Sequence, residues 1–529
     1  MTQTVAGTTD ETEVDAGRPR PLRLPARLAV PLAAVAGAIS VLAFPRTYWW
    51  PTLPLGVALL TVAVYRQRVR TGLLLGAVYG VTYFLPLLFW VRVLGYDAWV
   101  ALSVIETLYV AVMGAGIALV SRLRLWPLWS ACLWVLQELV RGHEPFGGFS
   151  WGRLAFGETH TPYTPLAALG GAPLVTFAVA LTGGLLAWAA LSFTTRRLRA
   201  ALAAVGAVAL ACCGLLVPAP QPTGRTIEVA VVQGNVPREG LDFLGQREAV
   251  LRNHAAATHQ LAAEIRAGKV PRPDFVVWPE NSSDVDPIHD LGARAIVTSA
   301  VRDVGVPVLV GGLVLSDDGH ELTNTGIVWD PRTGPGQQYS KRQLVPFGEY
   351  VPMRPVMTRL IGRLDRIPMD FTPGTKPGRL HIDGVRVGDV MCYEVAYDQR
   401  VRSSMVGASL LTVQTNNATY GGTLQLDQQF SISRLRAVEH GRPVAIAATS
   451  GISAIIDQHG DVLAESKQFT RAMYVRRVQL VQGVTLADRV GAWPERVAAI
   501  VGLLAVVVAL VARRRERART GQRAQELTT

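Results

Sequence analysis

Lysine is scarce in this sequence of 529 residues, since only four of its 52 cationic side chains are lysines. Cysteine is also rare, with four copies. The sequence has no cluster of residues with metal-ligand spacing, no phosphate-binding glycine loop and no nucleotide motif, and therefore predicts no cofactor. Charged residues make up only 17% of the chain and hydrophobic residues 50%. This balance excludes a mainly disordered chain and argues against a purely soluble enzyme.

Charge is distributed unevenly along the chain. Residues 22–217 contain 19 charged residues in 196, whereas residues 218–529 contain 67 in 312. Most of the apolar runs between the charges approach the roughly 20 residues that cross a bilayer. They cover residues 26–44, 48–65, 72–94, 98–120, 123–140, 173–193, 200–217 and 495–512. We therefore expect a polytopic α-helical membrane protein with about eight spans. The run 123–140, which contains Pro127 and Glu138, is the weakest of them.

The arginines indicate the orientation of these spans. With the N-terminus inside, the inner segments contain 18 arginines and the short outer loops four. Because inner loops of membrane proteins are enriched in basic residues, we expect both termini in the cytoplasm and the polar block 218–490 outside. That block is nearly neutral, with 29 cations and 28 acids, so the net charge of +12 belongs to the inner segments. The basic composition thus gives no support for nucleic-acid binding.

We expect five parts along the chain. They are a disordered cytoplasmic tail (1–21), a membrane domain with about seven transmembrane helices (22–217), an extracytoplasmic catalytic domain (218–490), a C-terminal transmembrane helix (491–512) and a basic cytoplasmic tail (513–529). Strand-like runs cover residues 226–235, 274–280, 306–315, 324–330, 385–394, 409–417 and 442–450. Amphipathic helical runs cover 246–267, 288–303 and 425–440. Their alternation predicts a layered α/β domain.

Three residues of the polar block could carry chemistry. Cys392 is its only cysteine and follows an apolar strand, so it is either a free nucleophile or a buried bystander. A thiol nucleophile needs a base and a positive neighbour. Glu280 ends a strand at WPE, and Lys341 is a rare lysine in QQYSKRQLVPFGEY. Taken singly, Glu280 could be a loop acid and Lys341 a surface charge.

In combination, the three residues occur in the order that is typical of the nitrilase superfamily. With seven spans before this block and one after it, the chain resembles the bacterial apolipoprotein N-acyltransferase family over nearly its whole length. The matching stretches are VVQGNVP (231–237), WPE (278–280), YSKRQLVPFGEYVP (339–352), CYE (392–394), SRLRAVEHGRP (433–443) and, in the membrane part, WVLQELVRGHEPFGGFSWGRLAFG (134–157). The resemblance implies an αββα sandwich with a Glu–Lys–Cys triad.

The resemblance also implies roles for individual residues. Cys392 would accept an acyl chain as a thioester, Glu280 would be the general base, and Lys341 would stabilise the oxyanion together with the backbone N–H of Tyr393. Glu349, Tyr393 and Glu394 match further residues that the family needs, and Asn324 matches a family asparagine near the site. The implied donor is a membrane phospholipid. The implied acceptor is the α-amine of the diacylglyceryl-cysteine at the N-terminus of a lipoprotein, and we expect a monomer.

The sequence departs from the family pattern around the expected substrate pocket. The family's N-D-A-W-F-G is here a run from Asn416 through Asn417 and Tyr420 to Gly421, in which an amide replaces the acid and a threonine the tryptophan. At 448–451, A-T-S-G replaces the family's A-T-N-N-G. These changes affect donor or acceptor preference more than the triad. They leave a paralogue with altered or weak acyltransferase activity as an alternative.

Other hypotheses use the same residues differently. A membrane-anchored nitrilase-type amidase would use water in place of an amine, and a scaffold protein would carry a decayed site. A transporter is disfavoured because the spans show no paired repeats. Two acids fall within predicted spans, where such groups are functional candidates. We expect Glu138 to contact Arg141, and we assign no partner to Glu106. The stretch 353–371 is either an amphipathic lid on the membrane surface or an ordinary surface helix.

The predicted orientation can be tested with reporter fusions. A reporter fused after Thr529 should be active on the cytoplasmic side, because the basic C-terminal segment stays inside. A reporter inserted near residue 220 should be active outside. Reporter activity on the opposite side in either fusion would contradict the orientation.

Overall fold

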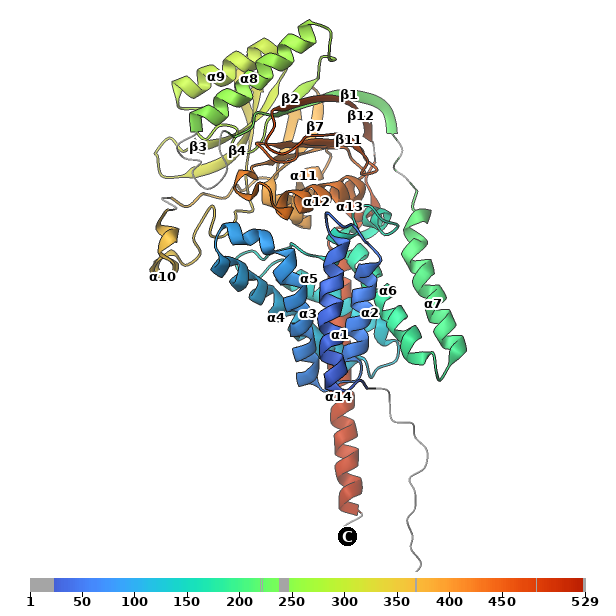
Figure 1. Ribbon diagram of the computed structural model, residues 1–529. Helices are drawn as coiled ribbons and strands as arrows, with labels where there is room; N and C mark the ends of the chain where they lie inside the picture. Colours follow the sequence, from blue (N-terminus) through green and yellow to red (C-terminus); the bar gives the residue numbers. More distant parts are fainter. Residues whose placement is uncertain are drawn as a thin grey trace, which may run out of the picture.

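The computed structural model describes residues 23–218, 220, 222–236, 247–366, 369–481 and 483–526. The expected tail 1–21 lies outside these residues. An α/β sandwich lies above a bundle of helices, and the C-terminal helix runs down along the bundle (Figure 1). The domain boundaries that we expected stay predictions.

Helices occur at all eight of the expected apolar runs. They are α1 (Ala26–Ser40), α2 (Thr52–Val64), α3 (Val69–Leu87), α4 (Tyr96–Val120), α5 (Trp126–Arg141), α6 (Ala167–Ser192), α7 (Arg197–Cys212) and α14 (Trp493–Glu526). Within the described residues, five helical ranges are long and apolar enough to cross a membrane: Ala26–Ala43, Tyr96–Val120, Thr164–Ser192, Arg197–Leu216 and Trp493–Arg519. The membrane character is therefore confirmed, while the count of eight spans stays a prediction.

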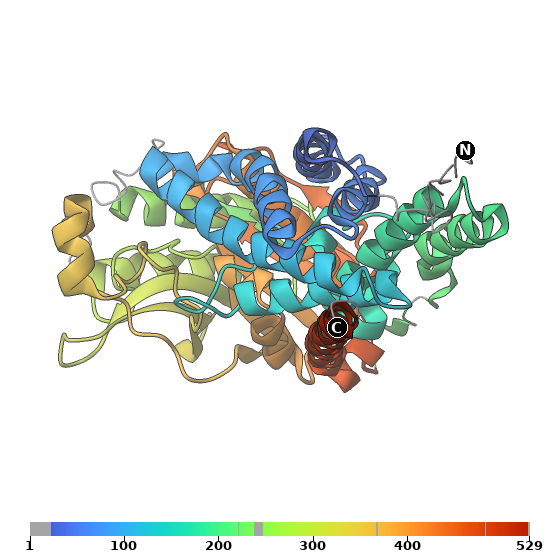
Figure 2. The ribbon, with the colours of Figure 1, turned by 90° about the horizontal axis from the view of Figure 1, so that it is seen from below.

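Small residues allow helices of the bundle to pack closely. A Cβ atom added at Gly72 of α3 would lie 2.6 Å from the carbonyl oxygen of Gly114 on α4. Glycine at such positions lets two backbones approach in a bilayer, where dispersion contacts replace the hydrophobic effect. Seen from below, α7 lies at one edge of the bundle and α14 beside α5 (Figure 2). Helix α14 continues beyond the expected span through the basic tail as far as Glu526.

Two six-stranded sheets form the sandwich. The first has the order β12-β1-β2-β3-β4-β5 and the second β11-β10-β9-β8-β7-β6. The strands of the first sheet are β1 (Pro222–Gln233), β2 (Phe275–Val277), β3 (Val308–Leu315), β4 (Leu322–Asp330), β5 (Gly334–Ser340) and β12 (Ala472–Val481). Those of the second are β6 (Arg379–Ile382), β7 (Val385–Met391), β8 (Leu410–Thr415), β9 (Val444–Ala448), β10 (Ala454–Ile456) and β11 (Val462–Glu465).

Alternation along β1 explains the layers. Val229 and Val231 point into the core between the sheets, where they join Val387 and Leu410 of the second sheet. Val232, on the other face, packs in a core with residues of α8 (Arg247–Arg266) and α9 (Leu291–Val304). Successive side chains of a strand point to opposite faces, so an unbroken apolar run fits a sheet that is covered on both sides. These two helices cover the side away from the bundle (Figure 1).

The other helical layer lies between the second sheet and the bundle. It contains α11 (Asp398–Met405) and α12 (Leu424–His440), and the short α13 (Leu486–Val490) packs on α6. Apolar residues of this layer and of the bundle form one continuous buried cluster, which includes Leu426 of α12 and Leu87 of α3. At the kink of α6, Gly171 has φ +72°, and a Cβ atom there would meet the Glu439 carboxylate of α12 at 2.9 Å. The sandwich is therefore packed on the membrane part through α12.

All seven expected strands and all three expected helices of this region are present, as β1–β4, β7–β9, α8, α9 and α12. The sequence analysis missed β5, β6, β10, β11 and β12 and the helices α11 and α13. These elements are mostly short or partly exposed, so their apolar pattern is weak. The stretch 353–371 contains α10 (Arg354–Leu360) and a 3₁₀ turn (Gly362–Arg366), and Arg363 pairs with Asp97 at the start of α4 (2.8 Å). Its role as a membrane lid stays a prediction.

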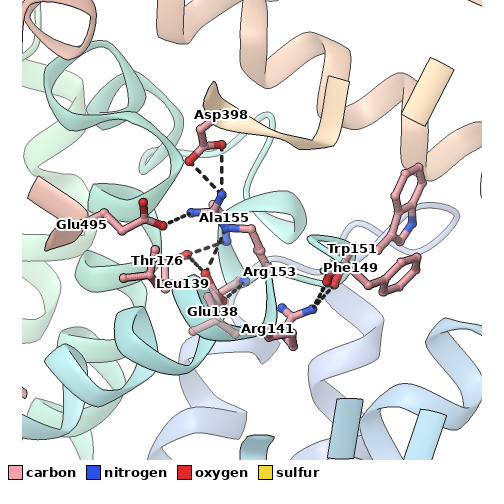
Figure 3. A network of polar contacts seen from close by, with 12 residues as sticks. Glu138, Leu139, Arg141, Phe149, Trp151, Arg153, Ala155, Thr176, Asp398 and Glu495 are labelled. Carbon is pink, nitrogen blue, oxygen red and sulfur yellow. Dashed lines mark hydrogen bonds and ion pairs between the residues drawn. The ribbon is translucent and has the colours of Figure 1, made fainter. Parts of the chain in front are cut away.

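Buried ion pairs connect the bundle to the sandwich (Figure 3). The Arg153 guanidinium lies 3.2 Å from Glu138 of α5 and 2.9 Å from Asp398 of α11. Glu495 at the start of α14 lies 3.9 Å away. Asp398 also pairs with Arg436 of α12 at 2.7 Å. Acids from three helices, α5, α11 and α14, thus meet at one arginine.

The expected partner of Glu138 was wrong. Glu138 pairs with Arg153 and accepts a hydrogen bond from the Leu154 N–H (2.8 Å), whereas Arg141 points toward α4 and pairs with Glu106 (2.9 Å). Glu106, to which we assigned no partner, therefore has one. Spacing within α5 suggested a local contact, but the packing of α4 against α5 decides the pairing.

Replacing Arg153 should destabilise the folded protein strongly. Arg153→Met removes the shared partner of Glu138 and Asp398, and loss of one member of a buried pair typically costs about 3–5 kcal/mol. The thermal unfolding midpoint in detergent should fall several times further than in a control, Arg477→Met, which removes an exposed partner of Glu228. Equal shifts in the two variants would show that the buried network contributes no more than a surface pair.

Candidate active site

The ends of three strands bring the predicted triad together. Glu280 follows β2, Lys341 follows β5, and Cys392 follows β7. Strands β2 and β5 belong to one sheet and β7 to the other, so the site lies where the ends of the two sheets face each other. Glu280 and Lys341 are buried, and Cys392 is partly accessible.

The Lys341 ammonium lies between two carboxylates. Its Nζ donates to Glu280 Oε1 (2.9 Å) and to Glu349 Oε1 (2.8 Å). Asn324 Nδ2 donates to the same two oxygens, at 2.7 and 3.3 Å. The backbone N–H of Asn416 donates to Glu280 Oε2 (2.9 Å). The structure therefore places Glu349 and Asn324 in direct contact with the predicted triad.

Burial and charge act in opposite directions on these groups. Burial raises the pKa of Glu280, and the Lys341 charge opposes this shift. Burial disfavours the Lys341 ammonium, but Glu280 and Glu349 outweigh it and raise the pKa of Lys341. Lys341 is thus cationic, and Glu280 is a carboxylate that takes up a proton more readily than an exposed glutamate does. A base with these properties can accept a proton from a thiol and return it later.

Cys392 stands on a strained turn between β7 and a 3₁₀ helix (Cys392–Ala396). Its φ is +48°, a left-handed conformation that is uncommon for cysteine. The Sγ atom lies 4.0 Å from Oε1 of Gln429, in α12. Burial and the charge of Glu280 raise the pKa of the Cys392 thiol to about 12, although Lys341 lowers it. The resting thiol is therefore protonated at neutral pH, and attack on a carbonyl carbon requires a base.

Glu394 fixes this turn against the loop that carries Lys341. Its Oε1 accepts hydrogen bonds from the backbone N–H groups of Arg342 and Gln343, both at 2.9 Å. Its Oε2 accepts from Tyr339 Oη (2.6 Å) and from the Met391 N–H (2.9 Å). Glu394 is thus a positioning residue, since its bonds hold the flanks of the nucleophile and of the lysine together.

Tyr393 faces the bundle and not the triad. Its ring stacks on Trp151 and Phe149, with ring centroids 6.3 and 6.1 Å apart, and its hydroxyl donates to the Gly148 carbonyl (3.2 Å). All three partners lie in the loop after α5, within the membrane stretch that resembles the family. The side chain of Tyr393 therefore anchors the nucleophile turn to the membrane part.

The three predicted pocket residues lie beside the thiol. Asn416 contacts Glu280 through its backbone, whereas the Asn417 side chain donates to Gln425 Oε1 (2.7 Å) and Gln429 Oε1 (3.0 Å). Tyr420 is half-buried, and its ring lies edge-on to Trp90 of the bundle, with centroids 5.2 Å apart. Asn417, where the sequence departs from the family pattern, therefore contacts the glutamine whose amide lies 4.0 Å from the thiol.

Sequence reasoning missed several residues that build the bundle side of the site. Gln428 Oε1 accepts hydrogen bonds from the indole N–H groups of Trp90 (3.1 Å) and Trp151 (2.7 Å), and its Nε2 donates to the Leu87 carbonyl (3.1 Å). The G-F-x-W motif around Trp151 could have indicated this part of the site from the sequence. No sequence motif marks the glutamines of α12. Among the described residues, no group of three or more His, Cys, Asp and Glu side chains could hold a metal ion.

The sandwich, the Glu–Lys–Cys cluster and the apolar helices define a membrane-bound enzyme of the carbon–nitrogen hydrolase class. Residues 228–487 match the family model described as carbon-nitrogen hydrolase, and residues 36–185 match the apolipoprotein N-acyltransferase N-terminal domain. A protein of Mycolicibacterium smegmatis named apolipoprotein N-acyltransferase is 38% identical over 90% of this chain and 85% of its own length. One of Azotobacter vinelandii is 30% identical over 93% and 96%. The chain therefore belongs to the apolipoprotein N-acyltransferase family of acyltransferases.

Solved structures of carbon–nitrogen hydrolases are more distant. A carbon-nitrogen hydrolase from Helicobacter pylori is 16% identical, covers 48% of this chain and 89% of its own, and gives a TM-score of 0.35. Nit3 of Saccharomyces cerevisiae is 17% identical, covers 52% and 97%, and gives 0.36.

The protonated state of Cys392 predicts its reactivity. Because the thiol pKa is raised to about 12, the rate of iodoacetamide labelling should still rise about tenfold per pH unit between pH 8 and 10. Peptide mass spectrometry of the Cys392 peptide measures this rate, and Cys392→Ala identifies the signal. Lys341→Met should slow labelling further, because it removes the cation that favours the thiolate. A plateau below pH 9 would mean that the resting thiol is already activated.

Proposed function

We propose that this protein transfers a fatty acyl chain from a membrane phospholipid to the α-amine of the N-terminal diacylglyceryl-cysteine of lipoproteins. The membership in the acyltransferase family supports this reaction, and one observation carries its mechanism. A protonated thiol, a carboxylate of raised pKa and a buried ammonium meet beside a turn whose Tyr393 stacks on Trp151 of the membrane part. This arrangement suits acyl transfer through a cysteine thioester.

In the first half-reaction, Glu280 takes the proton of the Cys392 thiol as the sulfur attacks the ester carbonyl carbon of the phospholipid. The carbonyl π bond breaks, and its oxygen carries the negative charge of a tetrahedral intermediate. Lys341 Nζ and the Tyr393 N–H stabilise this oxyanion. The intermediate collapses to a thioester, the C–O bond breaks, and the departing lysophospholipid oxygen takes the proton from Glu280.

The second half-reaction repeats this sequence with an amine. The neutral α-amine of the acceptor attacks the thioester carbonyl carbon, and Glu280 accepts one of its protons. The oxyanion forms at the same donors. Collapse breaks the C–S bond, and the proton passes from Glu280 to the thiolate, which regenerates the Cys392 thiol and leaves an amide on the lipoprotein. One base therefore serves both halves.

The placement of the site suits substrates that are held in a bilayer. Trp90 and Trp151 of the membrane part donate to Gln428, the neighbour of the Gln429 that contacts the Cys392 sulfur, so the site lies next to the membrane part. The arginine distribution supports an extracytoplasmic position for the sandwich and a cytoplasmic position for both termini in the plasma membrane. We propose an active monomer, and no nucleic-acid partner because the block 218–490 is nearly neutral overall.

A nitrilase-type amidase is the second candidate, because the same triad could pass an acyl group to water. The contact between the site and the membrane part favours lipid substrates over small soluble amides. The amide cluster around Asn417 and Gln429 favours a changed pocket, and this keeps an acyltransferase of altered preference as a variant of the first proposal.

The triad variants test the function. Cys392→Ala should abolish acylation of lipoproteins, and Glu280→Gln should slow it about 10²–10⁴-fold, because the base is lost. The rate should also fall as the pH decreases through the raised pKa of Glu280, since the protonated carboxyl cannot accept a proton. Mass spectrometry of a lipoprotein N-terminus measures the product, and hydroxylamine-sensitive acylation of Cys392 detects the thioester.

Matched variants serve as controls. Cys132→Ala changes a buried cysteine of α5, and Glu321→Gln changes an exposed acid just before β4. Both should keep full activity. Triacylated lipoprotein in cells that carry only the Cys392→Ala protein would contradict the proposal. Ammonia release from a small amide without acyl transfer would support the amidase.

A further inference from the structure

A basic cavity lies at the opposite end of the second sheet from Cys392. It has a volume of about 400 Å³, and Arg386, Arg402 and Arg442 contribute to its walls together with a single acid, Asp488. An adjoining cavity of about 210 Å³ shares Arg386, Ser409 and Val481 with it. Three arginines and one acid at one concave site contrast with a sandwich region that is almost neutral.

The topology explains why these arginines gather and why they are remote from the triad. Strands β7, β8 and β9 run parallel. Arg386 and Arg442 stand at or just before the beginning of β7 and β9, whereas Cys392 follows the other end of β7. Seven residues of strand separate the two ends by about 20 Å. The cavity is therefore distinct from the active site.

The positive charges in this cavity are only partly balanced by the described residues around it. Among the residues that the structure describes, Arg386 and Arg402 have no anionic partner. Arg442 donates to backbone carbonyl groups, including that of Ala408 (3.0 Å). Burial lowers the pKa of Arg442, the charge of Asp488 opposes this shift, and the nearby Arg386 adds to it. The single acid of the cavity, Asp488, already has a partner, because its Oδ1 lies 2.7 Å from His440 Nδ1. Guanidinium groups in this situation favour an anionic ligand.

The rim of the cavity is apolar and lies close to the membrane part. Val406 and Val484 line it and are 58% and 53% exposed. The wall formed by Gly483 and Val484 leads into α13, which packs on α6 at the upper end of the bundle (Figure 1). Helix α14 begins at Trp493, five residues after Asp488, and its exposed indole is typical of a membrane interface.

We infer that this cavity binds the phosphate of an anionic membrane phospholipid, with Arg386 and Arg402 as its ligands and the valine rim against the first part of the acyl chains. Accessible cations with an apolar rim beside the membrane part suit an anionic amphiphile better than a soluble anion or a zwitterionic lipid. The site is separate from the one that supplies the acyl donor. A lipid held here would join the loop before β8 to the segment that leads into the C-terminal helix.

Photocrosslinking of the full-length protein in nanodiscs tests this site. A phosphatidylglycerol with a diazirine near its headgroup should label peptides from 398–409 and 481–490 at least fivefold more than the phosphatidylcholine analogue. Arg386→Gln with Arg402→Gln should weaken the binding roughly thirtyfold, because each interfacial arginine contributes about 1 kcal/mol. The control Arg302→Gln with Arg332→Gln removes two exposed charges on the sandwich outside the cavity and should keep the labelling.

Acyl-transfer activity and the unfolding midpoint of the double variant should match the wild type, which separates loss of the site from misfolding. Equal labelling by the two lipids, or labelling that the double variant keeps, would overturn the inference. Glycerol 3-phosphate at millimolar concentration should not displace the label. Displacement by it would show a site for a soluble phosphate and would overturn the assignment to a lipid.

Discussion

The position of the nucleophile depends on the ion pairs of Asp398. This carboxylate begins α11, six residues after Cys392, and it is held by Arg153 from the membrane part and Arg436 from α12. Charged groups in such a buried place are tolerable only when every partner is present. The pairs therefore define one arrangement of the turn relative to the bundle. The same turn is held on its other side by Glu394 and by the stacking of Tyr393 on Trp151.

Around the triad, one cation faces two carboxylates. Lys341 is shared by two carboxylates, so the site keeps one excess negative charge that can accept a proton from the thiol. The raised pKa of Cys392 means that the protein does not store a thiolate. Activation is coupled to the arrival of an acyl donor, and this coupling protects a partly accessible thiol from unproductive reactions.

Glu280, Lys341 and Cys392 were identified because their order along the chain resembles that of the nitrilase superfamily. Each lies in a short motif that can be read from the sequence, and the structure brings all three together. The long apolar helices were predicted from the apolar runs themselves. The pairs Glu106–Arg141 and Glu138–Arg153 could not be predicted, because they depend on which face of α5 packs on α4.

The edge strands β5, β6 and β12 were missed because partly exposed strands carry a mixed pattern. Gln428 and Gln429 were missed for a different reason. Their amides make these contacts only because α12 packs between the second sheet and the bundle. The residue spacing within the helix does not predict that packing.

Gln428 accepts hydrogen bonds from two tryptophans of the membrane part while its own helix belongs to the sandwich. The bundle side of the site thus combines residues of the sandwich and of the membrane part, and we expect these residues to change together. If the sandwich were exchanged for that of a distant relative, the residue at the position of Gln428 would have to fit Trp90 and Trp151 of this membrane part. We therefore expect the two parts to be inherited as one unit.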